Sequence, residues 1–359
     1  DTFGLEVSNQ PTPRQPFLLE SIEALTAKAV DYDAASPGAV GGVINAVTKS
    51  GTNEFHGSLF GTYRDNSMVR DNANGTDYTG FDSERTYGLT FGGPLVKDRL
   101  FFFIDAEDYR LQAPAPSYGP IGSGATNIVN LSQADIDAVR AIAQTRWGFD
   151  PGTIGSASSA DTTGRTWGAK FDWNLTDEHR LVYRHSSTTQ SQANFPGFAP
   201  NSLAFSSYGY QRQFDLDTDT LQFMSSWSDR LSTQASASYR RYVTDREPNS
   251  RLPAVAVLVN PSAILFMGTE ENSYLYRLQN TAWNAAFGAQ FIAGDHEIDA
   301  GLDWSRNAIN NLYARRINGT YGFANLGLFQ AGISTPFRFS YPLDGDPANM
   351  AADWTLENI

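Results

Sequence analysis

The stretch GGVINAVTKSGTNEFHGSLF, residues 41–60, changes its side-chain pattern in the middle. Residues 41–48 form a glycine-led apolar run, and residues 49–53 are polar or glycine. From residue 55 onward every second residue is small or apolar, which is the period of a β-strand with one apolar face. The stretch predicts an apolar strand, a polar link and a two-faced strand. Taken alone, it also fits an ordinary β-hairpin with a loop of five residues.

The composition favours an all-β protein and excludes several classes of function. Of the 359 residues, 13% are aromatic, 31 are glycine and only 18% are charged, which suits strands and turns. The net charge is -13 and no run of Lys or Arg exceeds two, so we expect no nucleic-acid partner. Because there is no cysteine, disulfides, thiolate nucleophiles and cysteine-based metal sites are excluded.

Two-faced strands recur along the chain. In residues 166–174, Trp167, Ala169, Phe171 and Trp173 alternate with mostly polar residues. The same period is found, with varying regularity, in residues 55–63, 86–93, 100–110, 180–187, 220–227, 231–242, 281–291 and 297–305. We expect about nine or ten strands.

The connections between these strands alternate in length. Tight polar turns are expected at residues 96–99, 176–179, 228–230 and 293–296. Long connections are expected at about 65–84, 112–163, 190–212 and 246–272. An outer-membrane β-barrel sorts its connections in this way, with short turns in the periplasm and long loops outside. The pattern therefore predicts a transmembrane antiparallel β-barrel.

Tryptophans and tyrosines stand on the apolar faces of the expected strands. Rings of this kind gather where a membrane meets water, because one part is apolar and another is polar. The candidates for membrane-interface aromatics are Trp167, Trp173, Trp227, Trp283 and Trp304. A rival interpretation is a secreted, glycan-binding β-sandwich, in which the apolar faces would form a core.

One helix is expected at about 133–146, inside the longest connection. Ser132 is a suitable N-cap, and Gly148 follows the expected end. The helix either stiffens the loop, which we favour, or acts as a lid over a ligand.

Residues 17–64 resemble the end of the plug and the first barrel strand of TonB-dependent outer-membrane receptors, particularly the Oar-like group. The resemblance is carried by residues 19–23, 31–33 and 41–58, and further by 91–94, 97–103, 294–298 and 301–304. It implies that residues 1–53 are the C-terminal part of a plug domain. Residues 54–359 would then be the first part of a barrel of about 22 strands.

The resemblance also implies a function and a set of partners. A receptor of this family moves a ligand across the bacterial outer membrane, and its plug gates the barrel lumen. Its partners would be the TonB energy-coupling complex, an unknown transported ligand, and outer-membrane lipid and lipopolysaccharide. The alternative is a surface adhesion or structural barrel without active import. The residues expected at the plug–barrel junction are Gly41, Gly42, Asn45, Thr48, Lys49, Gly51 and Asn53.

A set of charged residues shares the polar phase of the strands and would face the barrel lumen. The set comprises Arg64, Asp105, Glu107, Lys170, Asp172, Arg180 and Arg184. Such residues either anchor the plug by charge pairs, which we favour, or contact a passing solute.

No motif for catalysis or for metal binding occurs in the sequence. The four histidines are scattered, and no nucleophile elbow, P-loop or dinucleotide fingerprint is present. Asp215, Asp217 and Asp219 share one strand face, where they could gather a divalent ion, but we expect them to be simply solvated. The sequence predicts no enzyme, no catalytic residue, no metal site and no cofactor.

Overall fold

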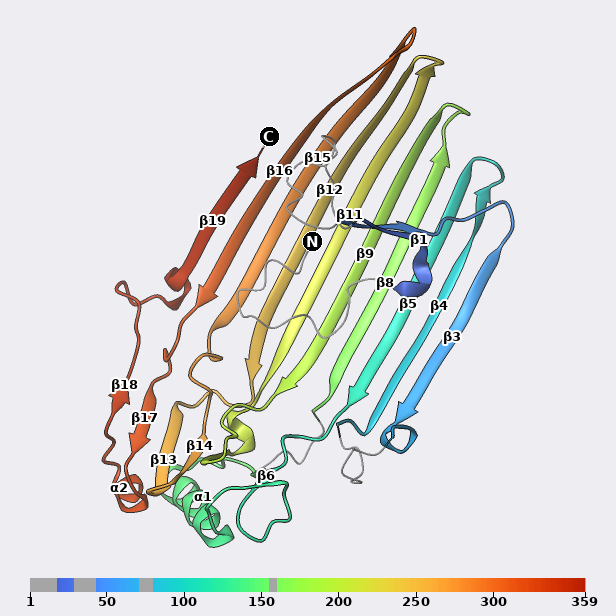
Figure 1. The fold of residues 1–359 in the computed structure, drawn as a ribbon. Helices are drawn as coiled ribbons and strands as arrows, with labels where there is room; N and C mark the ends of the chain where they lie inside the picture. Colours follow the sequence, from blue (N-terminus) through green and yellow to red (C-terminus); the bar gives the residue numbers. More distant parts are fainter. Residues whose placement is uncertain (1–17, 29–42, 71–79, 155–159, 359) are drawn as a thin grey trace.

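A long, single-layer antiparallel sheet dominates the fold, with a smaller folded unit at one end and a strand pair against one face (Figure 1). In this computed structural model the described residues are 18–28, 43–70, 80–154 and 160–358.

Ten strands form the long sheet, and each pairs with its neighbours in chain order. They are β3 (His56–Asp65), β4 (Ser83–Val96), β5 (Leu100–Gln112), β8 (Thr162–Asn174), β9 (His179–Asn194), β11 (Tyr210–Ser228), β12 (Leu231–Pro248), β15 (Tyr276–Ala293), β16 (His296–Tyr313) and β19 (Ala351–Asn358). β3 and β19 are the edges of this sheet within the described residues. The prediction of about nine or ten two-faced strands is confirmed.

Short turns lie at one end of the long sheet and long connections at the other (Figure 1). The turns are residues 97–99, 175–178, 229–230 and 294–295, as the sequence predicts. The long connections are 66–82, 113–161, 195–209, 249–275 and 314–350, the last of which was not predicted. The third is shorter than the predicted 190–212, because β9 and β11 stay paired as far as Asn194 and Tyr210. A ladder of backbone hydrogen bonds continues there without the apolar alternation that marks the rest of the strand.

Four of the five long connections fold together into a unit that we call the loop cap, residues 113–154, 195–209, 249–275 and 314–350 (Figure 1). Its sheet has the order β10 (Ser202–Ala204), β14 (Ala263–Met267), β13 (Ala254–Asn260), β17 (Thr320–Phe323) and β18 (Phe337–Arg338). The cap also contains β6 (Tyr118–Gly119), β7 (Asn127–Ile128), α1 (Gln133–Trp147), α2 (Leu326–Ala331) and the 3-10 turns η4 (Ser206–Tyr208) and η5 (Pro347–Met350). Val139, Leu203, Val257 and Leu265 are fully buried in its apolar core. The largest apolar core of the described residues thus lies in the loops and not beneath the long sheet.

Helix α1 has the ends that the sequence predicts. Ser132 and Asp135 form a capping box: the Ser132 N–H donates to Asp135 Oδ2 at 2.9 Å, and the Asp135 N–H donates to Ser132 Oγ at 3.1 Å. Gly148 ends the helix in the left-handed region, with φ of 61°. Ile136 and Val139 turn into the cap core, so α1 is a packing element. No helix in the described part of the chain is long and apolar enough to cross a membrane.

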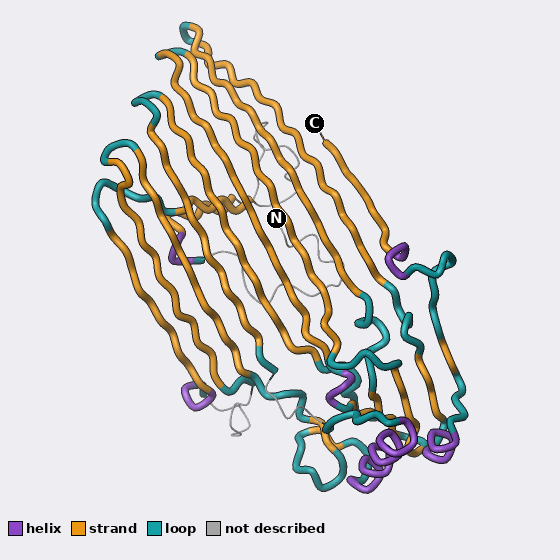
Figure 2. The backbone as a smooth tube through the Cα atoms, turned by 180° about the vertical axis from the view of Figure 1, so that it is seen from behind, coloured by secondary structure: helices purple, strands orange, loops and turns teal. Residues whose placement is uncertain are grey.

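A short antiparallel pair, β1 (Ile22–Lys28) and β2 (Val43–Thr48), lies against one face of the long sheet. It follows the 3-10 turn η2 (Leu19–Ser21). The pair is in front of the sheet in Figure 1 and behind it in Figure 2, which is turned by 180°. We call this side the inner face and the opposite side the outer face. Residues 66–68, after β3, form the 3-10 turn η3 (Asn66–Met68).

The outer face is apolar and is not covered by a second layer. Leu302 is 60% exposed, Trp167 49% and Phe171 38%, and Trp304 is half-buried. Other exposed apolar residues in the same phase are Leu59, Leu89, Phe91, Ile104, Trp173, Leu221, Trp227, Trp283, Phe287 and Ile298. An exposed apolar surface that extends over a whole sheet marks contact with lipid or with another protein.

Candidate functional site

The link between β2 and β3 is held against the short-turn end of the long sheet. Where β2 ends, the Lys49 N–H donates to the Ser21 carbonyl at 2.8 Å. The Asn53 side chain braces the β4–β5 turn twice: its Nδ2 donates to Asp98 Oδ1 at 2.6 Å, and its Oδ1 accepts from the Asp98 N–H at 2.8 Å. Asp98 has φ of 63°, a conformation that Asp adopts more readily than most residues. The link therefore has a defined path instead of a free loop.

Gly51 brings this link into contact with the backbone of two strands. A Cβ atom at this position would lie 2.3 Å from the Phe102 carbonyl oxygen and 2.7 Å from that of Gly93. Because both neighbours are backbone atoms, only glycine fits without a shift of the sheet. Of the other predicted junction residues, Asn45 pairs with Thr26 across β1 and β2. The predicted Gly41 and Gly42 lie outside the described residues.

Lys170 on β8 connects the inner face of the long sheet to the end of β2. Its Nζ donates to the Thr48 carbonyl at 3.0 Å and to Ser50 Oγ at 2.8 Å. The side chain is only 12% exposed, and its nearest anion is Asp172, at 3.9 Å. Hydrogen bonds from a charged donor are among the stronger ones in proteins. Lys170 is thus the described side chain that joins the inner face directly to the link.

The other predicted charged residues lie on the same inner face, and most surround Lys170. Asp172 is almost fully buried and also pairs with Arg180. Arg184 stands directly opposite Lys170 in the β8–β9 register. The Asp105 carboxylate leans over Gly168, where a Cβ would lie 3.0 Å from either oxygen, so the glycine makes room for it.

Two predicted charged residues lie apart from this cluster. Arg64 pairs with Glu84 at 2.5 Å and stacks on the Phe81 ring. Glu107 is on the same face between them, opposite Gly88 and Thr166. The structure therefore brings together Asp105, Lys170, Asp172, Arg180 and Arg184, places Arg64 apart from them, and places Glu107 between the two.

The predicted interface tryptophans are all on the outer face, four of them at two levels. Trp173 and Trp227 stand next to the short turns, one residue from the ends of β8 and β11. Trp167 and Trp283 lie closer to the long connections, whereas Trp304 lies at the middle of β16, where its Nε1 donates to Glu357 Oε1 at 2.7 Å. Apolar residues such as Phe171 fill the interval between the two levels.

The three aspartates of β11 also lie on the outer face, on the long-connection side of Leu221. Each accepts a hydrogen bond from β9, Asp215 from Thr189 at 2.9 Å and Asp217 from Ser187 at 2.8 Å. Asp219 accepts from the Tyr183 hydroxyl at 2.7 Å. They are cross-strand partners of their neighbours, a role that solvation alone does not describe.

Sequence patterns did not identify Ser50 or Asp98 as parts of the junction. Ser50 belongs to the polar link and Asp98 to a recognised turn, but their partners are 120 and 45 residues away. Only the pairing of strands brings such residues together. The sequence signal that could have identified Asp98 was its short polar side chain in a tight turn.

Comparisons with known proteins agree with this geometry. Residues 47–121 match the model of a family described as an outer membrane beta barrel domain. The TonB-dependent transporter Oar of Myxococcus xanthus is 44% identical over 72 residues, which are 18% of this chain and 7% of the relative. The probable TonB-dependent siderophore receptor PirA of Acinetobacter baumannii is 31% identical over 173 residues, 48% of this chain and 17% of the relative.

Over the matched residues the chain is similar to TonB-dependent receptors of the outer membrane, Oar among them.

The fold of this receptor is also that of a solved outer-membrane transporter. The crystal structure of YddB from Escherichia coli superposes with a TM-score of 0.56 at 13% sequence identity, over 94% of this chain and 40% of the other. The long sheet is accordingly part of a transmembrane β-barrel, and the receptor is located in the bacterial outer membrane. The chain corresponds to less than half of the YddB chain and to smaller parts of the two relatives. In this setting the apolar outer face contacts lipid, which explains why no second layer covers it.

Proposed function

We propose that this receptor imports a ligand across the outer membrane, with residues 1–53 acting as the end of a plug and residues 54–359 as barrel wall. The observation that carries the proposal is the contact of Lys170 with Thr48 and Ser50, which ties the end of β2 to the inner face. A gate needs an attachment of this kind, strong enough to hold at rest and local enough to be released by force. The named relatives, one a TonB-dependent transporter and the other a probable siderophore receptor, support the assignment.

The charged cluster on the inner face would anchor the plug. Lys170 carries one positive charge toward the link, while Asp172 is shared between Lys170 and Arg180. Because Asp172 is buried, the loss of its two cations would leave a buried carboxylate without a partner, which costs free energy. We infer that Asp105, Glu107 and Arg184 extend this anchoring surface and that Arg64 holds the β3–β4 edge through Glu84.

The TonB complex would supply the energy that loosens the plug from this surface. The cargo is a solute too large or too scarce to diffuse through an open pore, and the function is transport without chemical conversion. A static surface barrel is the competing function, and it predicts that the same contacts never open.

Uptake with and without TonB tests the proposal. The natural protein that contains this chain would be expressed in cells with and without tonB and supplied with a defined mixture of ferric siderophores, oligosaccharides and peptides. We expect mass spectrometry to detect at least one compound that accumulates only when both the receptor and TonB are present.

A chemical lock links that uptake to the junction. Cysteines at Ser50 and Lys170 would be joined by a reducible, bifunctional thiol reagent, since the natural sequence of the chain offers no competing thiol. Accumulation should stop on cross-linking and return on reduction, while the Ser50→Cys single variant should be unaffected by the reagent. Uptake that is absent, or equal without TonB, would assign the protein to the static surface barrels.

A further inference from the structure

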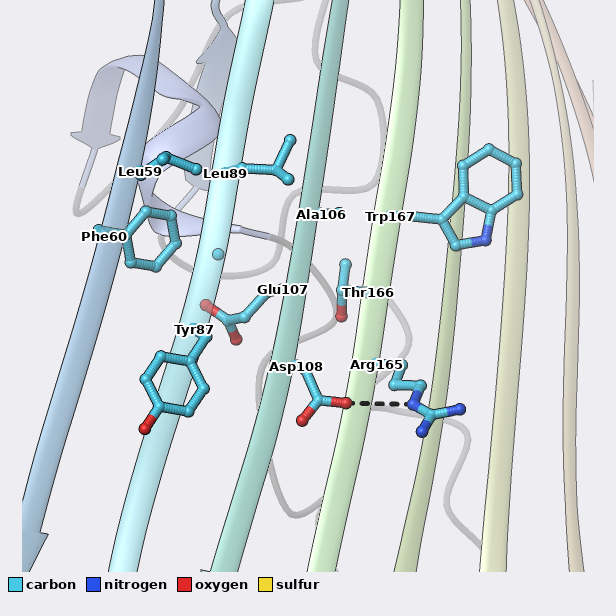
Figure 3. A pocket seen from close by; sticks show the side chains of 11 residues that line it. Leu59, Phe60, Tyr87, Leu89, Ala106, Glu107, Asp108, Arg165, Thr166 and Trp167 are labelled. Atoms are coloured by element: carbon cyan, nitrogen blue, oxygen red, sulfur yellow. Dashed lines mark hydrogen bonds and ion pairs between the residues drawn. The ribbon is translucent and has the colours of Figure 1, made fainter.

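A hollow of about 590 Å³ interrupts the apolar outer face across four neighbouring strands (Figure 3). It lies over Ala106 on β5, between Leu89 of β4 and Trp167 of β8. Along the strands it ends at Asp108 and Arg165, one step closer to the long connections. The hollow is thus apolar over most of its length and charged at one end.

Small residues on three strands create this hollow. Ala106 has Leu89 and Trp167 as its cross-strand neighbours and leaves a gap between them. Tyr87 leans toward β3, where Gly61 offers space: a Cβ on Gly61 would lie 3.1 Å from the Tyr87 ring. Trp167 leans the other way and packs on His185, with ring centroids 4.7 Å apart. Figure 3 shows the two rings turned away from one another, with Ala106 between them.

The charged end of the hollow presents hydrogen-bond donors. The Arg165 Nε donates to Asp108 Oδ2 at 3.1 Å. Its side chain is 82% exposed, and none of the described residues accepts a hydrogen bond from either Nη atom. The planar guanidinium therefore offers two donors in a fixed fork, which suits a phosphate group.

A second group of arginines lies one step further toward the long connections. Arg85 and Arg110 stand directly opposite one another in the β4–β5 register. Like charges in that position destabilise a sheet unless an anion compensates them. Arg110 pairs with Asp161 at 2.5 Å, whereas Arg85 is exposed and forms no ion pair within the described residues. Together with Arg165 and Asp108, the patch holds three cations and two anions, on a chain whose net charge is -13.

We propose that this patch and hollow form a binding site for the lipid A part of lipopolysaccharide. One acyl chain would lie in the hollow over Ala106, and a phosphate would bind Arg85 and Arg165. The charged end of the hollow points toward the long connections, which face outside, so the phosphate belongs to a lipid of the outer leaflet, where lipid A is found. The site depends on the membrane location of the receptor and not on whether it transports a ligand.

The test measures how much lipid remains bound after purification. The natural protein that contains this chain would be extracted in mild detergent and analysed by native mass spectrometry, after exchange against equal amounts of lipopolysaccharide and phosphatidylglycerol. One variant, Arg85→Gln with Arg165→Gln, removes the phosphate donors. A second, Ala106→Leu, fills the hollow and touches no buried residue, so a failure to fold would not account for its effect.

We expect wild-type protein to keep lipopolysaccharide and the double arginine variant to keep about tenfold less, as expected for the loss of charge-assisted contacts. Ala106→Leu should also keep less lipopolysaccharide than wild type, because its side chain occupies the space of the acyl chain. The matched control is Arg306→Gln, an outer-face arginine on β16 opposite Trp283, which should behave as wild type. Equal retention by all variants would overturn the proposal, and so would a preference for phosphatidylglycerol or a similar loss in the control.

Discussion

At the scale of single residues, the junction depends on the short polar contacts of Lys170 and Asn53. Lys170 reaches the end of β2 and the link through the Thr48 carbonyl and Ser50, and Asn53, within the link, reaches the β4–β5 turn at Asp98. The Thr48 backbone carbonyl would be present with any side chain at position 48. The residue at position 170 therefore determines whether the contact forms. The sequence showed which phase of β8 Lys170 occupies, but it could not show which residue of the link lies within reach, because that depends on the path after Thr48.

Replacing Lys170 by Met keeps the length of the side chain and removes its charge and donors. A hydrogen bond from a charged group contributes about 1.5–3 kcal/mol, so the link should open more often. We expect the Lys49 amide, which donates to the Ser21 carbonyl, to exchange hydrogen about tenfold faster or more. Hydrogen exchange with mass spectrometry would measure the exchange rate of this amide in wild type and variant. Lys97→Met, in an exposed turn, is the control, and equal exchange in both variants would remove the anchoring role.

At the scale of elements, the strands and turns of the long sheet were predictable and the loop cap was not. The strands carry a local signal, because a sheet with lipid on one side imposes alternation on every strand. In the cap, β13 pairs in parallel with β17, which joins Ala254 to Thr320 from another connection. Residues 252–269 carry no alternation that would indicate this pairing. Helix α1 was the exception, since its capping residues are local.

The cap is also held by Glu271, which joins two connections through Arg315 and Arg316. The Arg316 Nε donates to Glu271 Oε2 at 2.6 Å, and Arg315 binds the other oxygen. Burial raises the pKa of Glu271, but the hydrogen bonds from Arg316 and Arg315 outweigh it and hold the pKa below its ordinary value. Because the folded-state pKa is the lower one, the stabilisation is complete above the ordinary value and is lost as the pH falls through the folded-state value.

Acidification should therefore loosen the cap around residues 314–319. We expect hydrogen-exchange protection in this segment, corrected for intrinsic rates, to be constant near neutrality and to decrease below about pH 4. Glu271→Gln should lower the protection at neutral pH and flatten the pH dependence. A variant that keeps the wild-type pH profile would show that another group controls it.

At the scale of the whole molecule, the direction of the barrel follows from its connections. The receptor should carry its short turns in the periplasm and its loop cap outside the cell. Single cysteines at Asp229, in a turn, and at Leu343, in the cap, would be treated with a membrane-impermeant maleimide on intact cells. We expect labelling at 343 at once and at 229 only after permeabilisation. Labelling at 229 on intact cells would reverse the orientation.

The sequence predicted this architecture from pattern together with resemblance, and each contributed a different part. Pattern gave the alternation and the sorted connections, whereas the role of residues 41–53 came from the resemblance alone. A hairpin was also compatible with the pattern, since a polar link looks the same whether it joins two strands of one sheet or two separate sheets. The structure shows separate sheets, β1–β2 and the long sheet, joined by the link.

The outer face of the long sheet contacts hydrocarbon, while the inner face contacts water or protein. Nitroxide labels at Leu302 and at its neighbour Asp303 test it most directly, because successive residues of a strand point to opposite faces. In lipid-reconstituted receptor, power-saturation measurements should show frequent collisions of the label at 302 with oxygen, which partitions into lipid. The label at 303 should instead collide with a water-soluble nickel chelate. Nickel accessibility at 302 equal to that at 303 would show that the outer face is not in contact with lipid.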